Sequence, residues 1–483
     1  MRVLLLHVPK RHQVWAGVPD VFNDRHAYLF PPLAVMYLSA YLKRTTRHQV
    51  SVLDCVVEDL DYPGIGRRVA ALQPDLIGVS ATSSHSLVDV RRSIEAARAA
   101  CPEVFVVLGG AHVNSFPELA VRLPGVDAAI QGDAEEPLRL LLETLERHGD
   151  LEQVPGILLR KGDGSVFHGQ PAHPVDDLDT LPFPDREACP PRRYYTPGMR
   201  GHRTTTMMTS RGCPYRCVFC NVPTRYRARS AENVVAEIEE CVSRYGTQDI
   251  HFVDDLFNST SERVMEISEL ILRRGIKVWW GYKASVRQTT REMIRLARRA
   301  GCYRMHYGVE TFTPEGLKAL NKHATVDEIR DVFRMTKEEG VKAIAYMIIG
   351  CPHEKSAAEI LEVIPFMHDL APSYVVYSLF TPYPDAPIFA EGVKRGLWPA
   401  DCWERFMLDP SEDHKLPTAW EEHLDKQELL TVFKRVNNAF YFHPRTLFRT
   451  FFGLRTLAEL KHILLGGYQL LRMWFLRPEQ GKI

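Results

Sequence analysis

The chain has 483 residues, of which 45% are apolar and 25% charged, and its 60 basic residues balance 60 acidic ones. This length predicts two or three domains, and the composition is that of an ordinary globular protein. A net charge of zero gives no support for a nucleic-acid partner. The ten cysteines lack the spacing of a disulfide framework, and no run of about 20 apolar residues predicts a membrane span.

Short apolar runs alternate with amphipathic stretches through a first predicted domain, residues 1–147. The predicted strands are 3–7, 50–53, 76–80, 105–108 and 128–131, and the predicted helices lie near 33–43, 65–72, 86–100, 117–122 and 136–147. The first run, Met1–His7, is too short for a signal peptide and has no cleavage site. Strands separated by helices predict an α/β fold with an open, parallel, flavodoxin-like (Rossmann-like) sheet.

Polar and glycine-rich turns follow three of these strands. Ligands of open parallel sheets bind outside the carboxyl ends of the strands. Glycines permit a close approach of the backbone, and hydroxyl groups can donate hydrogen bonds to a ligand. The candidate binding residues are therefore Thr82, Ser83, Gly109, Gly110, His112, Gly132 and Glu135. The alternative is a sheet of this type that binds no ligand.

A segment rich in proline and charge, residues 148–200, predicts a domain boundary. Within it, Pro155–Gly164 predicts a hairpin, and Asp179–Asp185 predicts an extended linker. Alternation resumes over residues 201–395. The predicted strands there are 205–209, 250–253, 277–280, 304–308, 343–349 and 375–380, and the helices are 231–245, 261–274, 290–300, 326–339 and 357–369. Six such units predict a partial (β/α)6 TIM barrel with its chemistry at the carboxyl ends of the strands.

Three cysteines follow the first barrel strand, at Cys213, Cys217 and Cys220, with the spacing C-x3-C-x2-C. Three thiolates can hold three irons of a 4Fe–4S cube and leave the fourth iron open, which indicates chemistry at the cluster. A zinc site is the alternative, but zinc usually takes a closed set of four ligands. The chain has no second C-x2-C or H-x3-H pair to complete such a set.

This motif, with Phe219 before its last cysteine, closely resembles that of the radical S-adenosylmethionine (SAM) superfamily. The resemblance implies that SAM binds the open iron through its amino and carboxylate groups and yields a 5′-deoxyadenosyl radical. It also implies SAM contacts at later strand ends: Asp254 and Asp255 for the amino group, Gly308 and Glu310 for the ribose, and Gly350 near the adenine, in a turn where His353 replaces the usual glycine. For each carboxylate the alternative is a solvated loop or a structural salt bridge.

Four further residues, Lys283, His306, Tyr307 and Cys351, could line the substrate space, although a structural role is an equal alternative. No catalytic acid or base is assigned. A labile cluster favours the reducing conditions of the cytoplasm.

The first domain resembles the cobalamin-binding domain that precedes many radical SAM domains. The matching pieces occur in the family's order: Pro31-Pro32-Leu33, the Thr82-Ser83 turn, Gly109-Gly110-x-His112 and Gly132-Asp133-x-Glu135. One departure is Asp24-Arg25-His26, which has Leu29 where the Asp-x-His-x-x-Gly motif of cobalamin mutases has its glycine. We therefore interpret His26 as an ordinary loop residue, and His112 as a contact to the corrin or its tail rather than a metal ligand.

The last predicted region, residues 396–483, breaks the alternation and predicts helices at 429–442 and 454–475. From residue 430 onward the sequence has nine Lys and Arg residues and two Asp and Glu residues, a net charge of +7, and it is rich in aromatic residues. A helical cap that closes the substrate cavity is the favoured interpretation. The alternative is a basic amphipathic helix on an anionic membrane surface, which would place the protein at the inner membrane face.

Together the two resemblances imply three cofactors, a 4Fe–4S cluster, SAM and cobalamin, with the organic chemistry belonging to the cofactors. The leading hypothesis is methyl transfer to an unactivated carbon. The alternatives are a cobalamin-dependent radical SAM oxidative cyclase or rearrangement enzyme, such as the anaerobic magnesium-protoporphyrin ester cyclase, and a non-catalytic cobalamin sensor. A methylthiotransferase would need a second three-cysteine cluster, which is absent from the sequence. The expected partners are a small-molecule substrate, for which a hydrophobic compound is one option, and an external reductant of flavodoxin or ferredoxin type.

Overall fold

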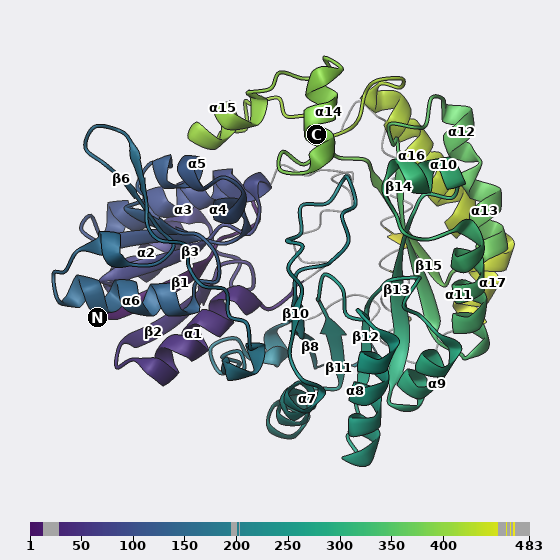
Figure 1. Ribbon diagram of the computed structural model, residues 1–483, viewed down its shortest axis with the longest axis horizontal. Helices are drawn as coiled ribbons and strands as arrows, with labels where there is room; N and C mark the ends of the chain where they lie inside the picture. Colours follow the sequence, from purple (N-terminus) through teal and green to yellow (C-terminus); the bar gives the residue numbers. More distant parts are fainter. Residues whose placement is uncertain are drawn as a thin grey trace. The chain divides into compact units, whose positions relative to one another are not determined.

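The computed structural model describes residues 1–12, 29–194, 200–201, 203–452 and four single positions after residue 452, namely 460, 464, 467 and 468. The chain divides into two compact units (Figure 1). Unit 1 comprises Met1–Val14, Pro31–Arg193 and Ala400–Leu416, and unit 2 comprises Trp15–Phe30, Tyr194–Pro399 and Pro417–Ile483. His26 lies outside the described residues.

Unit 1 is built on a seven-stranded sheet of order β2-β1-β3-β4-β5-β6-β7. The strands are β1 (Arg2–His7), β2 (Gln49–Asp54), β3 (Leu76–Ser80), β4 (Phe105–Gly109), β5 (Ala128–Ile130), β6 (Ile157–Arg160) and β7 (Val166–His168). The first five pair in parallel, in the flavodoxin-like order 2-1-3-4-5. The predicted hairpin forms β6 and β7, which extend the sheet in antiparallel fashion.

Helices cover both faces of this sheet. They are α1 (Leu33–Thr45), α2 (Tyr62–Leu72), α3 (Leu87–Ala100), α4 (Ala111–Ser115), α5 (Pro117–Arg122) and α6 (Glu135–Glu146). A further helix of unit 1, α15 (Cys402–Leu408), packs on α5. Apolar residues of α1 and α6 pack against Val3 and Leu5 of β1. Leu4 and Leu6 point to the opposite face and are equally buried. Burial on both faces explains why these strands read as continuous apolar runs.

Unit 2 contains a six-stranded sheet of order β15-β14-β13-β12-β11-β8, in which every pair is parallel. The strands are β8 (Thr204–Met207), β11 (Asp249–Phe252), β12 (Trp279–Ala284), β13 (Cys302–Glu310), β14 (Lys342–Ile349) and β15 (Tyr374–Leu379). Between β8 and α7 in the chain, β9 (Ser210–Arg211) and β10 (Arg227–Ala228) form a small antiparallel ribbon. All six predicted barrel strands are therefore confirmed.

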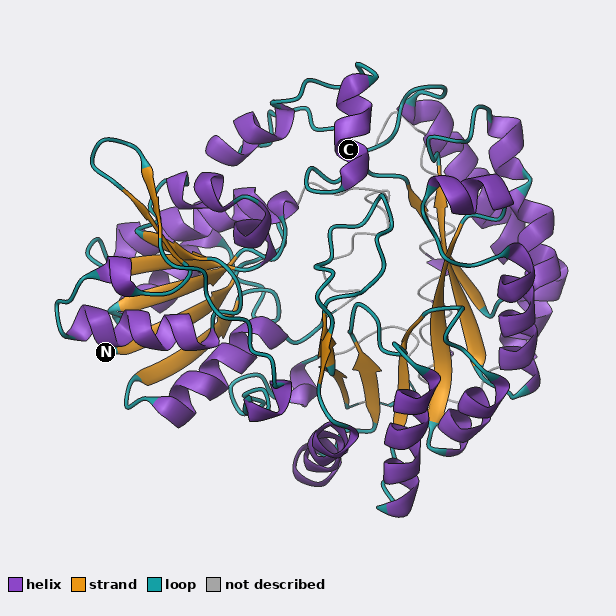
Figure 2. Ribbon diagram, viewed as in Figure 1, coloured by secondary structure: helices purple, strands orange, loops and turns teal. Residues whose placement is uncertain are grey.

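The helices of unit 2 follow its strands (Figure 2). They are α7 (Ala231–Tyr245), α8 (Ser261–Arg273), α9 (Arg291–Arg299), α10 (Pro314–Ala319), α11 (Val326–Glu338), α12 (Ala357–Leu361), α13 (Val363–Leu370), α14 (Pro387–Lys394), α16 (Lys426–Tyr441) and α17 (Pro444–Phe452). Six of them begin with a hydroxyl side chain that accepts from a backbone N–H three residues later, at Ser230, Thr260, Thr290, Thr313, Thr325 and Ser356. Such caps fix where each helix starts after its strand.

The sheet of unit 2 is covered by helices on one face. Alternate residues of its strands, among them Trp280, Tyr307 and Met347, join apolar residues of the helices in one large core. The residues between them point to the other face, which we call the inner face. Tyr307 thus belongs to the core, where its hydroxyl group lies 2.9 Å from Thr336 Oγ1, and it does not line a substrate space.

The C-terminal region does not pack as one body. Residues 400–416 belong to unit 1, whereas α16 packs on the helical side of the unit 2 sheet, where Phe433 and Val436 join the core. α16 therefore covers the unit 2 sheet on its helical side, away from the inner face, and does not close a cavity there. The predicted helix 454–475 lies almost wholly outside the described residues, and a membrane contact stays a prediction. None of the helices among the described residues is long and apolar enough to cross a membrane.

Candidate functional site

The three-cysteine loop leaves the ribbon β9–β10 through a tight neck. Gly212 has a φ of +83°, and a Cβ at this position would overlap the carbonyl oxygen of Arg225. The backbone N–H of Cys213 donates to the carbonyl oxygen of Pro223 at 2.9 Å. Glycine is thus required for a neck that closes the loop on itself and holds all three cysteines in one short segment.

Two other segments hold this loop from outside. The N–H of Val218 donates to the carbonyl oxygen of Leu320 at 3.3 Å, and the N–H of Ile388 donates to that of Val218 at 3.0 Å. The side-chain amide of Asn321 donates to the carbonyl oxygen of Arg216 at 2.6 Å. Phe219 is half-buried beside these anchors. The loop is therefore fixed to the segments after α10 and at α14, far along the chain.

The thiols lie at the border between protein and solvent. Cys213 and Cys217 are half-buried, and Cys220 is exposed. Burial raises the pKa of all three thiols, while the ammonium group of Lys322 lowers it. Neighbouring cysteines raise the pKa of Cys213 and Cys217 further. Within the described ranges no three His, Cys, Asp or Glu side chains converge tightly enough for one metal ion. A 4Fe–4S cube takes each thiolate on a separate iron, so three thiols spread over one anchored loop fit its ligand set.

The adjacent carboxylates Asp254 and Asp255 have different roles. Asp254 is fully buried, and its Oδ1 accepts from the N–H of Thr209 at 2.9 Å, from Thr209 Oγ1 at 2.8 Å and from Ser210 Oγ at 2.6 Å. Burial raises the pKa of Asp254, and these hydrogen bonds lower it. Asp254 therefore holds the strand end that leads into the cysteine loop.

Asp255 is exposed and belongs to the surroundings of the thiols. Its charge raises the pKa of Cys213 and Cys220. Burial of its carboxyl group raises the pKa of Asp255, whereas Lys283 and a hydrogen bond from the backbone N–H of Gly212 lower it. Of the two aspartates, Asp255 is the exposed one, and its charge acts on two of the thiols.

Glu310 ends β13 in an unusual backbone conformation. Its φ is +65°, and the pairing of β13 with β14 shifts register between Gly308 and Glu310. A side chain at Gly308 would overlap the Glu310 carboxylate, which Lys322 contacts at 3.3 Å. A strained residue held by its surroundings is typical of a functional position. Lys322 carried no sequence motif, and only the fold places its charge near both Glu310 and Cys217.

The predicted adenine turn after β14 is built around Glu354 rather than around Gly350. Gly350 has a φ of +73°, and a Cβ there would lie 2.8 Å from Leu429 of α16. The carboxylate of Glu354 accepts from the N–H of Cys351 at 2.8 Å, and burial raises the pKa of Glu354 to about 7. His353, in place of the family's glycine, lies 3.3 Å from Thr311 Oγ1, where Gly316 leaves room for its ring. Cys351 is buried and does not line an open space.

The carboxyl edge of the unit 1 sheet joins two predicted strand ends. Gly110 has a φ of +106°, and a Cβ at this position would lie 2.6 Å from the carbonyl oxygen of Ala81. His112 is buried, and its Nδ1 lies 2.9 Å from Ser84 Oγ. The space over Gly109 is open to at least 4 Å, and Thr82 is exposed beside it. Open space over glycine at these strand ends fits the approach of a broad, flat ligand such as a corrin.

The third strand end lies next to the second. The N–H of Gly132 donates to Asn114 Oδ1 at 2.7 Å, which ties the turn after β5 to α4. Glu135 is buried at the start of α6, where the helix dipole favours a carboxylate. Ser83 accepts from the N–H of His85 at 3.2 Å and shapes the turn after β3.

Sequence reasoning missed one element at this edge, α15 with the residues that follow it. Trp403 packs edge-on against His85 with the ring centroids 4.9 Å apart. Arg91 pairs with Asp409, and Arg92 pairs with Glu412 at 3.3 Å. A segment about 300 residues away in sequence thus holds the loop that carries Ser83 and Ser84. No short sequence motif could have predicted this packing, because each contact joins distant parts of the chain.

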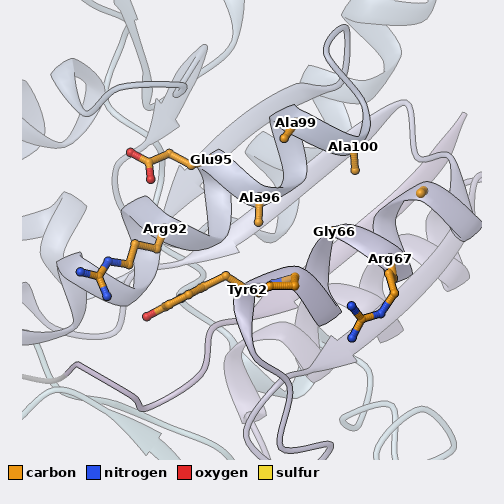
Figure 3. Close-up of a pocket in the computed structure, with 10 residues that line it drawn as sticks. Tyr62, Gly66, Arg67, Arg92, Glu95, Ala96, Ala99 and Ala100 are labelled. Carbon is orange, nitrogen blue, oxygen red and sulfur yellow. The ribbon is translucent and has the colours of Figure 1, made fainter.

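Unit 1 also has a hollow of about 690 Å³ between α2 and α3 (Figure 3). Ala96, Ala99 and Gly66 form much of its wall, with Tyr62 and Arg92 at one end. Tyr62 and Arg92 already have partners, because the Tyr62 hydroxyl donates to Asp89 at 2.6 Å and Arg92 pairs with Glu412. The hollow lies between two helices rather than at the strand ends, and we do not assign it to the functional site.

Two parts of the chain match known protein families. Residues 20–142 match the B12 binding domain family, and residues 207–364 match the radical SAM superfamily. An uncharacterized methyltransferase of Pyrococcus horikoshii is 28% identical over 87% of this chain and 90% of its own length. The anaerobic magnesium-protoporphyrin IX monomethyl ester cyclase of Rubrivivax gelatinosus is 27% identical over 81% and 70%, respectively.

Among solved structures, the cobalamin-dependent SAM radical enzyme OxsB, with aqua-cobalamin and SAM bound, covers 98% of this chain and 72% of its own, with a TM-score of 0.70 and 18% identity. The chain is thus an enzyme of the class that joins a B12-binding domain to a radical SAM domain. Its cofactors are cobalamin, SAM and a 4Fe–4S cluster. Such enzymes act on small-molecule substrates and take electrons from an external reductant.

Proposed function

We propose that this enzyme transfers a methyl group to an unactivated carbon of a small molecule. The observation that carries the proposal is the presence, in one chain, of a B12-binding domain and a radical SAM domain whose loop offers three anchored thiols. In bound form, cobalamin supplies a methyl carrier, and SAM at the cluster supplies a hydrogen-abstracting radical. The name of the Pyrococcus relative, which matches nearly the whole chain, supports methyl transfer.

In this proposal, the residues of the chain bind and orient. Cys213, Cys217 and Cys220 hold the cluster, with Phe219 beside them. Asp255 and Glu310 receive the polar groups of SAM, because both lie at strand ends near the thiols. Asp254 positions the start of the cysteine loop through its three hydrogen bonds to Thr209 and Ser210, and it does not itself reach SAM.

The carboxyl edge of the unit 1 sheet is proposed to hold cobalamin. The open space over Gly109 and the exposed Thr82 would face the corrin. Ser83, Gly110, His112, Gly132 and Glu135 would shape the turns around it. In this arrangement His112 is a positioning residue, since its ring is buried and hydrogen-bonded to Ser84.

An oxidative cyclisation is the second candidate, and one specific observation favours it. The Rubrivivax relative, named a magnesium-protoporphyrin ester cyclase, matches 81% of this chain. Both reactions would use the same three cofactors, so the site geometry described above serves either one.

The products made from SAM separate the two candidates. The full chain would be purified anaerobically with cobalamin, its iron reconstituted, and incubated with SAM and dithionite before chromatography. Both S-adenosylhomocysteine and 5′-deoxyadenosine are expected, since methyl transfer uses SAM in two ways. Deoxyadenosine alone, with cobalamin bound, would replace methyl transfer by the cyclase proposal. Bound cobalamin without any SAM cleavage would point to a sensor instead.

A further inference from the structure

The inner face of the unit 2 sheet is polar and partly open. Lys283 of β12 is exposed there, and Trp279 of the same strand and Val376 of β15 remain 38% and 42% exposed. All three alternate with residues of the helix-side core, so they share the inner face. The inner face therefore carries both solvent-accessible and buried side chains.

Arg304, on the β13 part of this face, is a buried cation whose hydrogen bonds are not satisfied. It is 5% exposed, and among the described residues its Nε and Nη2 atoms have no hydrogen-bond acceptor. Gly281 makes room for it, because a Cβ there would overlap Arg304 Cγ. Leaving buried N–H groups of a charged side chain unpaired costs several kcal/mol unless a partner arrives.

The nearest buried acid does not provide that partner. Burial raises the pKa of Asp249 and the charge of Arg304 opposes this, but no ion pair joins the two side chains in the described structure, where Asp249 Oδ1 is itself buried without a partner. One oxygen of Asp249 instead accepts from the hydroxyl of Tyr303 at 2.7 Å and from the N–H of Arg200 at 2.7 Å. The guanidinium is therefore held near a carboxylate without being neutralised by direct contact.

The two atoms left unpaired define the shape of the missing partner. Nε and Nη2 lie on one edge of the guanidinium group, and a pair of parallel N–H donors matches the two oxygens of a carboxylate. A single water molecule could accept from both donors, but it would leave the guanidinium group without direct contact to a negative charge.

Two histidines lie along the same face. The rings of His251 and His306 are 5.2 Å apart, and His306 Nδ1 lies 3.0 Å from the Tyr346 hydroxyl. His306 Nε2 and His251 Nδ1 are buried and have no partner among the described residues. Burial lowers the pKa of both rings well below the usual range, so they are neutral near pH 7. They add hydrogen-bonding atoms to the site without further charge.

We propose that the substrate carries a carboxylate, and that the side-on edge of Arg304 binds it on the inner face, with His251 and His306 as neutral neighbours. This inference rests on the proposed function for the idea that a substrate enters here. It deepens that function by naming the chemical class. Lys283, exposed at the other end of the same face, draws anions toward it.

Titration calorimetry with benzoate and its neutral analogue benzamide tests the inference. The full chain, loaded with cluster and cobalamin, is used without reductant so that no turnover occurs. We expect saturable binding of benzoate and none of benzamide. Arg304→Gln should weaken benzoate binding about tenfold or more, and Arg304→Lys should also weaken it, because lysine keeps the charge but lacks the fork. Phenylphosphonate binding in place of benzoate would assign the site to a phosphoryl group and overturn the carboxylate.

Arg274→Gln is the matched control, since Arg274 lies on the helical side of the sheet in a solvent-accessible pair with Glu239. Its benzoate affinity should equal that of the wild type. Iron and cobalamin contents verify that each variant is folded, and Lys283→Gln, at an exposed position, gives a second test if Arg304 variants do not fold. Wild-type protein that ignores benzoate, or folded Arg304 variants that bind it normally, would overturn the proposal. Because the calorimetry measures binding and no product, its result can be interpreted even if the enzyme does not transfer a methyl group.

Discussion

The two large sheets of this enzyme differ in how many of their faces are covered. In unit 1, strands β1 and β3–β5 are largely buried on both faces, and the candidate binding residues lie at the strand ends. The unit 2 sheet has helices on one face, and every second strand residue is free to carry chemistry on the other. The comparison teaches that a doubly covered sheet binds at its edge, whereas a singly covered one can bind along its strands.

Substitutions in the cysteine loop should have the largest effect on activity. They should abolish a function of unit 2 and leave cobalamin binding by unit 1 intact. Cys213→Ala, Cys217→Ala or Cys220→Ala should each reduce 5′-deoxyadenosine formation to background, because three thiolates are needed to hold the cube. Cobalamin binding by unit 1 should remain. Cys101→Ala, a half-buried cysteine of unit 1, is the control. SAM cleavage retained in any of the three variants would refute the cluster assignment.

The pair Asp254 and Asp255 tests whether adjacent residues on a singly covered sheet divide between structure and binding. Asp255→Asn should weaken SAM binding about tenfold with little change in thermal stability, because an exposed carboxylate near the thiols is lost. Asp254→Asn should lower stability by about 3 kcal/mol, since it disturbs a buried three-bond acceptor. Equilibrium dialysis of SAM and thermal melts measure the two effects. Equal effects of both variants on SAM affinity would contradict the division.

Trp403 tests whether the edge of the doubly covered sheet depends on the distant segment 400–416. Trp403→Ala should lower cobalamin retention severalfold while leaving iron content unchanged, because His85 and the Ser83 turn lose their packing partner. Glu404→Ala, an exposed change on the same helix, is the control. The absorbance of bound cobalamin after gel filtration gives the measurement. Normal cobalamin retention by Trp403→Ala would show that segment 400–416 does not support the cobalamin site.

Glu354 predicts the smallest effect, a pH dependence of stability located in unit 2. Burial raises the pKa of this carboxyl group from 4.5 to about 7 in the folded state. Between those values the unfolded chain ionises first, so the folded state loses stability as pH rises through this window, by a few kcal/mol at most. Glu354→Gln should remove that loss. The melting temperature of Glu354→Gln minus that of the wild type should therefore be larger at pH 8 than at pH 5. An equal difference at both pH values would contradict a raised pKa of Glu354.

The amino-acid sequence alone predicted most of the strands and helices along the chain, because hydrophobic periodicity acts locally. It also determined the three-thiol motif, since all three ligands fall within eight residues. The short helices α4 and α10 were missed, because such brief segments carry too little periodicity to be recognised.

Only the tertiary structure decided which of two neighbouring aspartates is buried, because burial depends on Thr209, Ser210 and the path of the loop they begin. It likewise placed Lys322 beside Glu310 and moved Tyr307 into the core. The packing of Trp403 on His85 and the unpaired edge of Arg304 have the same origin. Each arises from contacts between segments distant in sequence, where the burial of a charge or ring is set by its neighbours in space.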